Sequence, residues 1–173
     1  FRYTFTYANS KPLEDAYIGL FFDPDLGDFE RDYIGSDSLL RTGFVYKKEN
    51  YDSLYGDNPP ALAVTLLRGP LVDKDGLDNN GDGIIDEPNE HLDMTALITG
   101  NEVHEVGKQY FYNHLRGICG QTGAPIRDGH GCDNFEGQPT TFWYSGDPVT
   151  GTGWIDNRQP VDRVFLISSG PFY

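Results

Sequence analysis

The sequence has few positive charges and no long hydrophobic run. Its 13 lysines and arginines are set against 27 aspartates and glutamates, which gives a net charge of −14. A chain this acidic repels phosphate backbones and anionic lipid headgroups, so its composition argues against nucleic acids and anionic membranes as partners. No apolar stretch approaches the roughly 20 residues that a membrane-spanning helix needs, and membrane insertion is therefore not expected.

The sequence also lacks the common catalytic motifs. Its four histidines do not have the H-E-x-x-H spacing of a zinc site, and it contains neither a G-x-S-x-G elbow nor a glycine-rich phosphate loop. Two carboxylates suffice for glycoside hydrolysis, but the carboxylates of this chain gather in loops, where ionised groups serve as cation ligands. We therefore expect a protein that is not an enzyme.

Neither an initiator methionine nor a signal peptide precedes Phe1. The chain opens within a strand-like pattern and ends directly on Tyr173, so we expect a segment of a larger secreted protein. A length of 173 residues fits one domain, which would bury roughly 70% of the surface of its unfolded chain. Residues 1–173 are therefore expected to form a single domain.

Glycine, proline and aromatic residues are abundant, with 21 Gly, 11 Pro, 11 Tyr and 11 Phe. Frequent turns between aromatic-rich segments are typical of all-β proteins. Strands are expected at residues 1–7, 16–22, 39–46, 61–67, 140–144 and 163–168, and one short helix at 106–115. The predicted fold is an antiparallel β-sandwich, jelly-roll-like, with long calcium-binding loops. Residues 16–22 carry apolar groups on both faces and are expected to form a central strand.

The stretch from Asp73 to Glu87 is the reason to expect calcium. Oxygen-bearing side chains recur there at alternate positions, with glycines between them. Calcium takes six to eight oxygens at about 2.3–2.6 Å, and a short loop supplies them only when every second residue points inward and glycine relieves the tight turns. The candidate ligands are Asp73 and Asp75 for a second ion, and Asp78, Asn80, Asp82, the carbonyl of Ile84 and Asp86. The alternative is a solvated acidic turn.

The spacing follows the EF-hand pattern at its start and departs from it at its end. Asp78 takes the first ligand place, and the third, fifth and sixth places follow in register. At the twelfth place Asn89 replaces the bidentate glutamate, and the adjacent Pro88 prevents an exit helix. The loop resembles the non-helical calcium loops of dockerin-like and thrombospondin type 3-like repeats. That resemblance implies that the aspartate at the ninth place, here Asp86, is a ligand.

A second acidic cluster occupies residues 23–37, directly after the strand expected at 16–22. Aspartates at the end of a strand, interleaved with glycine, again suit a hard cation. The candidate ligands are Asp23, Asp25 and Asp28. No compact ligand template is matched, and the alternative is a long loop whose polar residues only form turns.

The two cysteines, Cys119 and Cys132, flank a glycine-rich loop. In a secreted chain such a pair favours a disulfide, which would add roughly 3 kcal/mol by closing a loop of this length. Two buried free thiols are the alternative.

Three aromatic residues near the C-terminus, Trp143, Tyr144 and Trp154, are candidates for sugar stacking. Tryptophan and tyrosine are also highly buried on average, so a place in the core is the alternative.

Several short motifs occur together and in a fixed order. They are Phe21–Gly27, Tyr55–Ala61, Asp78–Glu87, Thr140–Phe142, Gly146–Pro148 and Asp162–Phe172. This set, which covers most of the chain, resembles a region of large bacterial secreted proteins of the type IX secretion class. The resemblance implies an extracellular or cell-surface protein and does not imply an activity.

Two functions follow as hypotheses. The first is a calcium-stabilised structural or adhesion module of the cell surface, in which the aromatic segment 1–7 pairs with a second copy by strand addition to form an oligomer or filament. The second is a calcium-dependent carbohydrate-binding module for a surface glycan.

Overall fold

The computed structural model describes residues 2–100 and 107–173, and 31% of it is strand and 7% helix. The strands are β1 (Ala16–Phe22), β2 (Tyr33–Asp37), β3 (Thr42–Tyr46), β4 (Tyr51–Asp52), β5 (Gly56–Asp57), β6 (Leu62–Thr65), β7 (Ala96–Gly100), β8 (Ile126–Arg127), β9 (Pro139–Thr140) and β10 (Val164–Phe172), and the helices are the 3₁₀ turn η1 (Phe29–Arg31) and α1 (Lys108–Leu115). All the strand pairs are antiparallel. The expectation of an all-β fold with one short α-helix is confirmed; Val106, where that helix was expected to start, lies outside the described residues.

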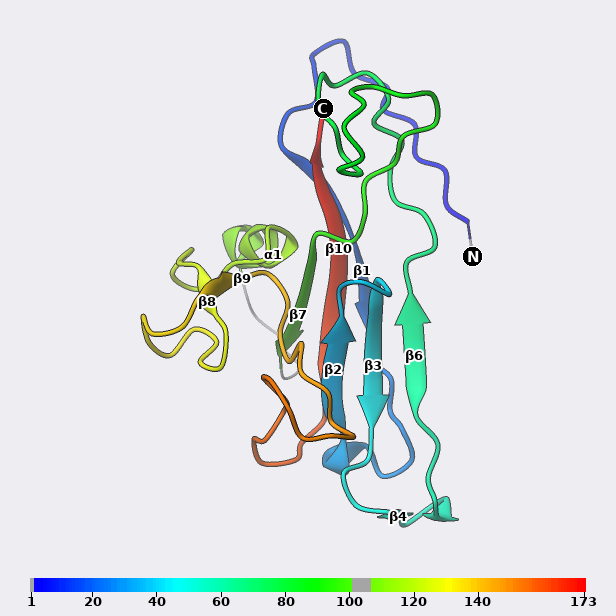
Figure 1. Cartoon of the computed structure of the whole chain (residues 1–173), viewed down its shortest axis with the longest axis vertical. Coiled ribbons are helices and arrows are strands. Elements are labelled where there is room, and N and C mark those ends of the chain that lie inside the picture. The colour runs from blue at the N-terminus through cyan, green and yellow to red at the C-terminus, as the bar shows by residue number, and fades with distance from the viewer. Residues whose placement is uncertain (1, 101–106) are drawn as a thin grey trace.

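Two three-stranded sheets form the body of the molecule. One has the order β1-β10-β7 and the other β2-β3-β6, and Figure 1 shows them face to face. The core between them joins Ile34 and Val45 of the second sheet to Leu97, Phe165 and Ile167 of the first. Because these side chains are excluded from water, their burial is the main force that holds the sheets together.

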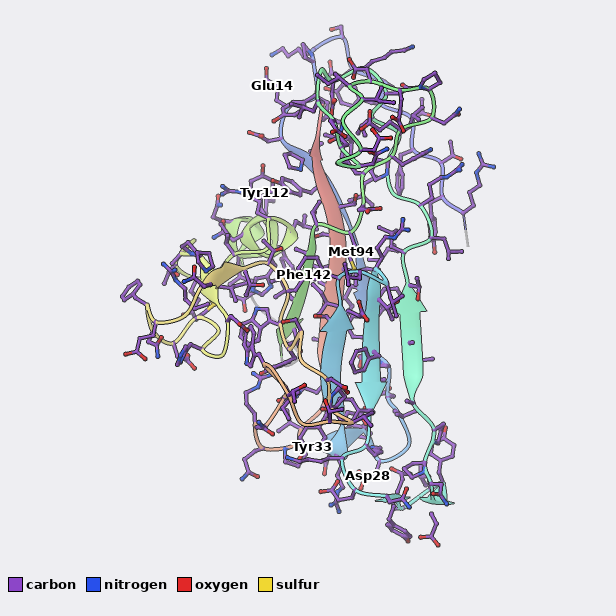
Figure 2. All side chains as sticks on the ribbon, in the orientation of Figure 1. Glu14, Asp28, Tyr33, Met94, Tyr112 and Phe142 are labelled. Carbon is purple, nitrogen blue, oxygen red and sulfur yellow. A yellow bond between two sulfur atoms is a disulfide. The ribbon has the colours of Figure 1, made fainter. Side chains whose placement is uncertain are left out.

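Strand β1 lies at the edge of its sheet, so its expected central position is wrong. Nine-residue β10 is central instead and pairs with β1 and β7. Both faces of β1 are apolar because α1 covers the outer face: the ring of Tyr17 meets Tyr112 edge-to-face at 5.8 Å, and Gly19 lets Leu115 approach the strand. The position of Tyr112 on the helix is visible in Figure 2.

Three other expected strands differ from the structure. Residues 2–7 form no strand and are exposed, because they pair with neither sheet. The expected strand 61–67 shortens to β6, an edge strand, and Leu67 is 85% exposed, because the outer face of this sheet meets solvent. The expected strand 39–46 begins only at Thr42, after an exposed turn.

The expected strand 140–144 becomes a connection between the two sheets. Thr141 accepts a hydrogen bond from the N–H of Leu97 in β7 at 3.0 Å, and Tyr144 accepts one from the N–H of Ser36 in β2, also at 3.0 Å. Phe142 packs against the core from the same segment (Figure 2). The segment 141–144 therefore closes one side of the sandwich, whereas β1 and β6 lie on the opposite side (Figure 1).

Candidate metal centre

Three carboxylates converge where β1 ends and β10 begins. In the register of these strands Phe22 pairs with Phe165, so the residues that follow β1 lie beside those that precede β10. One carboxylate oxygen each from Asp23, Asp25 and Asp162 lies within 4.8 Å of the others. Asp23 and Asp25 are exposed and Asp162 is half-buried, so the group is open to ions from solvent.

Two buried carboxylates fix the backbone of the loop that carries Asp25. The N–H of Leu26 donates to Asp32 Oδ2 at 3.1 Å, and the N–H of Asp28 donates to Asp52 Oδ2 at 2.9 Å. Gly27 has a φ of +64°, and a Cβ at this position would lie 2.4 Å from Asp52 Oδ1. Only glycine therefore allows the loop to sit this close to Asp52.

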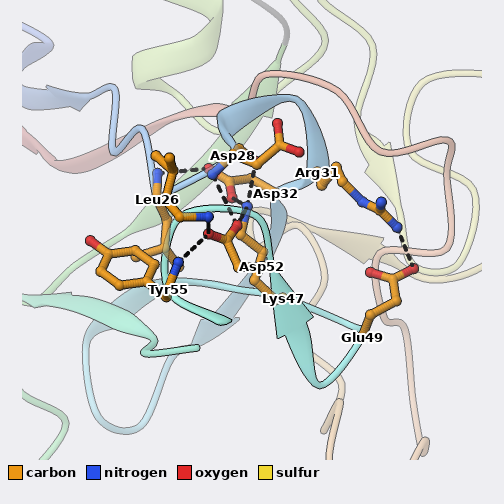
Figure 3. Close-up of polar contacts among 9 residues, drawn as sticks. Leu26, Asp28, Arg31, Asp32, Lys47, Glu49, Asp52 and Tyr55 are labelled. Atoms are coloured by element: carbon orange, nitrogen blue, oxygen red, sulfur yellow. Dashed lines mark hydrogen bonds and ion pairs between the residues drawn. The ribbon is translucent and has the colours of Figure 1, made fainter. Parts of the chain in front are cut away.

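Lys47 joins these two carboxylates, as Figure 3 shows. Its Nζ lies 2.8 Å from Asp32 Oδ1 and 3.2 Å from Asp52 Oδ2, and it also donates to the carbonyl of Asp28. All three charged side chains are at most 1% exposed. Since Asp52 also accepts from the N–H groups of Leu54 and Tyr55, the network ties the loop 23–28 to the segment that follows β3.

The two aspartates respond differently to burial. Burial raises the pKa of Asp32, and the nearby charge of Asp162 raises it further, while Lys47 and the N–H of Leu26 lower it only in part. Burial also acts to raise the pKa of Asp52, but three backbone N–H groups and Lys47 outweigh it and hold the pKa well below its ordinary value. Asp32 therefore couples the buried network around Lys47 electrostatically to Asp162, one of the three converging carboxylates.

A second buried ion pair holds the segment that contains Asp162. Arg163 Nε donates to Asp156 Oδ2 at 3.1 Å, and both side chains are at most 2% exposed. Arg163 Nη2 also donates to the carbonyl of Gln159 at 2.8 Å. These contacts fix the turn from Asp156 to the start of β10, which sets the position of Asp162.

The structure changes the membership of the second acidic cluster. Asp23 and Asp25 come together as expected, but Asp28 is not in the group, because its backbone is held by Asp52 and Lys47. Asp162 was not among the predicted ligands. The sequence does place Asp162 directly before an expected strand and Asp23 directly after another. It does not show that these two strands pair, which is what brings the two aspartates together.

The loop formed by residues 73–90 lies at the other end of the sandwich, beyond the end of β10 (Figure 1). Its glycines take the positive φ values expected of the turns, at +80° for Gly76, +77° for Gly81 and +96° for Gly83. No helix follows this loop, as the proline predicted. Three carboxylates do not converge within it, since the only such group in the described part of the chain is the one at Asp162.

Most predicted ligands of the 73–90 loop instead accept hydrogen bonds from its backbone. Asp78 accepts from Gly81 at 2.7 Å and Gly83 at 2.8 Å. The other such bonds are from Leu77 to Asp75, from Asp82 to Asn80, from Ile84 to Asp82 and from Gly76 to Asp86. Asp73 is half-buried at the start of the loop. The alternating oxygens therefore shape the turns, a role that they share with solvated acidic loops.

Cys119 and Cys132 are disulfide-bonded, with Cα atoms 5.7 Å apart, which excludes two free thiols. The bond closes the loop that contains β8. At Gly131 the loop touches the ring of Trp143. The disulfide therefore supports the aromatic residues that follow it.

The three candidate sugar-stacking residues form one cluster. Ring centroids of Trp143, Tyr144 and Trp154 are 5.1–5.6 Å apart, and the Arg158 guanidinium lies over the rings of Trp143 and Tyr144. Tyr144 is only 3% exposed, and burial strongly raises its pKa. The two tryptophans are half-buried. Tyr144 is thus a packing residue, and only the tryptophans retain surface for a ligand.

Comparison with known proteins gives no relative. No family model, no curated protein and no solved structure matches the chain. Within the described ranges no helix has the length and apolar character that a membrane crossing requires. The function is therefore inferred from the geometry of the chain itself.

Proposed function

We propose that this chain is a calcium-stabilised extracellular structural or adhesion module. The observation that carries the proposal is the convergence of Asp23, Asp25 and Asp162 from two distant parts of the chain. Like charges at this separation repel one another, and a cation bound among them would turn repulsion into attraction. In a chain of net charge −14, the same ion would also reduce the self-repulsion of the whole molecule.

Calcium is the cation that the donor set favours. All three side chains offer carboxylate oxygen, the ligand of hard cations, whereas zinc sites use histidine and cysteine. Calcium also accepts irregular coordination, which suits two exposed residues on a loop and one at the start of a strand. The site would join the end of β1 to the start of β10 and so stabilise the pairing of these two strands.

An extracellular location agrees with the disulfide. Disulfides persist in oxidising compartments and are rare in the cytosol, and Cys119 and Cys132 are bonded. Free calcium is also high enough outside cells to fill sites whose dissociation constants are in the range of about 10⁻⁴–10⁻³ M. Secretion, calcium and a structural role are therefore mutually consistent parts of the proposal.

Thermal unfolding in calcium and in excess EGTA tests the proposal. A site with a dissociation constant one hundredth of the free calcium concentration adds about 2.7 kcal/mol, or about 5–10 °C of Tm for a chain of this size. The double variant Asp23→Asn/Asp162→Asn should lose this increment, and the exposed control Asp128→Asn should keep it. An equal calcium-dependent rise in the double variant and the wild type would remove this site from the proposal.

Carbohydrate binding is the alternative, and the half-buried pair Trp143 and Trp154 supports it. Their ring centroids are 5.4 Å apart, and Arg158 beside them can donate hydrogen bonds to hydroxyl groups. On a glycan array, binding that falls on Trp154→Ala substitution would favour this function over the structural one.

A further inference from the structure

Glu90 occupies a fixed position at the base of the 73–90 loop. The two ends of the loop are joined by the bridge between Leu71 and His91, and the N–H of Val72 donates to the Glu90 carbonyl at 2.9 Å. The Glu90 side chain points into the loop, because its Oε1 accepts from the N–H of Asn79. Only 2% of the residue is exposed, although glutamate is rarely buried without a partner.

One oxygen of Glu90 lacks a hydrogen-bond partner, and so does one of Glu87. Both Oε2 atoms are shielded from solvent. Glu87 Oε1 accepts from the Asn80 side-chain amide at 2.7 Å, and no ion pair in the described part of the chain includes either glutamate. Buried carboxylate oxygens without partners are costly, so two of them in one loop require a compensating positive charge or a proton.

The neighbouring charges favour a cation over a basic side chain. Burial raises the pKa of Glu87, and the negative charges of Asp82 and Glu90 raise it further. Both charges act on Glu87, so Asp82 and Glu90 lie near it in a loop that is otherwise rich in amide and carbonyl oxygens. Such a set of oxygen donors with no nitrogen or sulfur ligand matches calcium.

We propose that Glu87 and Glu90 bind a calcium ion at the base of the 73–90 loop, with Glu90 as the buried anchor and oxygens of the loop as further ligands. The choice of calcium rests on the proposed function, but the site is separate from Asp23, Asp25 and Asp162. The EF-hand spacing ends before Glu90, which is why the sequence pattern indicated the loop and missed this ligand. The ion would neutralise the two partnerless oxygens and join the loop to the bridge at its base.

Hydrogen exchange measured by mass spectrometry tests this site in the whole chain. In about 1 mM calcium the wild-type peptide covering residues 73–92 should exchange more slowly than in EGTA. Glu87→Gln/Glu90→Gln should abolish that difference and weaken one binding event in calorimetry by about tenfold or more. Each glutamine keeps an acceptor for the existing hydrogen bond, so the fold is expected to remain. Glu136→Gln, an exposed control, should behave as the wild type.

The variants separate this inference from the proposed function. Asp23→Asn/Asp162→Asn should leave the protection of residues 73–92 unchanged, so either site can fail without the other. Two results would overturn the inference. One is calcium protection that persists in Glu87→Gln/Glu90→Gln. The other is a wild-type loop that calcium does not protect.

Discussion

At the scale of single residues, the buried Lys47 links the charged groups at the end of the sandwich near Asp25. It is the cation that contacts both Asp32 and Asp52, and all three side chains are almost completely excluded from solvent. A buried ion pair adds little net stability compared with apolar residues of the same size, but removal of one partner leaves an uncompensated charge. The network is therefore more sensitive to single substitutions than to its complete replacement.

Lys47→Met should lower the free energy of unfolding by about 3–5 kcal/mol, because it removes the ammonium from a buried carboxylate. Denaturant unfolding in EGTA measures this without a contribution from calcium. Lys48→Met is the matched control, since Lys48 is exposed and its contacts among the described residues are one of 3.3 Å with Asn157 and one with the ring of Tyr33. A loss that is equal in the two variants would show that the buried network is not important for stability.

Asp52 should make the protein sensitive to acid. Because its pKa is lower in the folded state than in the unfolded state, its contribution is complete above the unfolded value of about 3.9 and is lost as pH falls toward the folded value. Asp32, whose pKa is raised, acts in the opposite direction. In urea titrations between about pH 5 and pH 2 in buffer made without calcium, Asp52→Asn should therefore lose less stability than the wild type. Parallel pH profiles for the two proteins would contradict this assignment.

At the scale of secondary-structure elements, the distance between the two sheets depends on a glycine of β3. A Cβ at Gly43 would lie 2.6 Å from Leu97 Cδ1 and 2.7 Å from Phe165 Cε2. These two side chains belong to β7 and β10 of the facing sheet and are almost completely buried. The absence of a side chain at Gly43 therefore allows the core to pack at its observed density.

Gly43→Ala should destabilise the protein by about 1–3 kcal/mol, because an added methyl group must displace buried side chains. Gly100→Ala provides the control: it also lies in a strand, and a Cβ there meets no atom of the described residues within 4 Å. The difference between the two variants in thermal unfolding measures the cost of overpacking. A Gly43→Ala protein as stable as Gly100→Ala would mean that the sheets separate without strain.

The sequence predicted the elements whose pattern has a single explanation. The strand at 16–22 and the helix around Tyr112 are confirmed, and Val164–Phe172 extends the strand expected at 163–168. The pattern could not show which strands pair, so the edge position of β1 and the approach of Asp162 to Asp23 were not predictable. Leu67 was included in the strand expected at residues 61–67, because an apolar run does not show where a strand ends or which of its residues meet solvent.

At the scale of the whole molecule, the two sides of the sandwich differ. The segment 141–144 covers the edges of β7 and β2, while β6 has β3 as its only strand partner among the described residues. The segment 2–7 alternates aromatic and polar residues, and its aromatic side chains at Tyr3, Phe5 and Tyr7 are 51–68% exposed. A free edge and an unpaired alternating segment are the two components of strand addition between copies.

Self-association through this segment is therefore expected to depend on its aromatic residues. The triple variant Tyr3→Ser/Phe5→Ser/Tyr7→Ser should reduce particle size in dynamic light scattering at high protein concentration, because it removes the apolar face of the added strand. The matched control is Leu39→Ser/Leu40→Ser, which removes two exposed apolar residues from a turn. Particle size that is unchanged in the triple variant would exclude assembly through residues 2–7.

The register of β1 with β10 also has a mechanical consequence. Ala16 pairs with Phe172, so the chain enters β1 and leaves β10 at the same end of the sheet. Tension applied to the flanking chain would open this strand pair one hydrogen bond at a time, like a zipper, rather than shear all its bonds together. Asp23, Asp25 and Asp162 lie at the far end of that zipper, so an ion bound there would secure the last pairs to open.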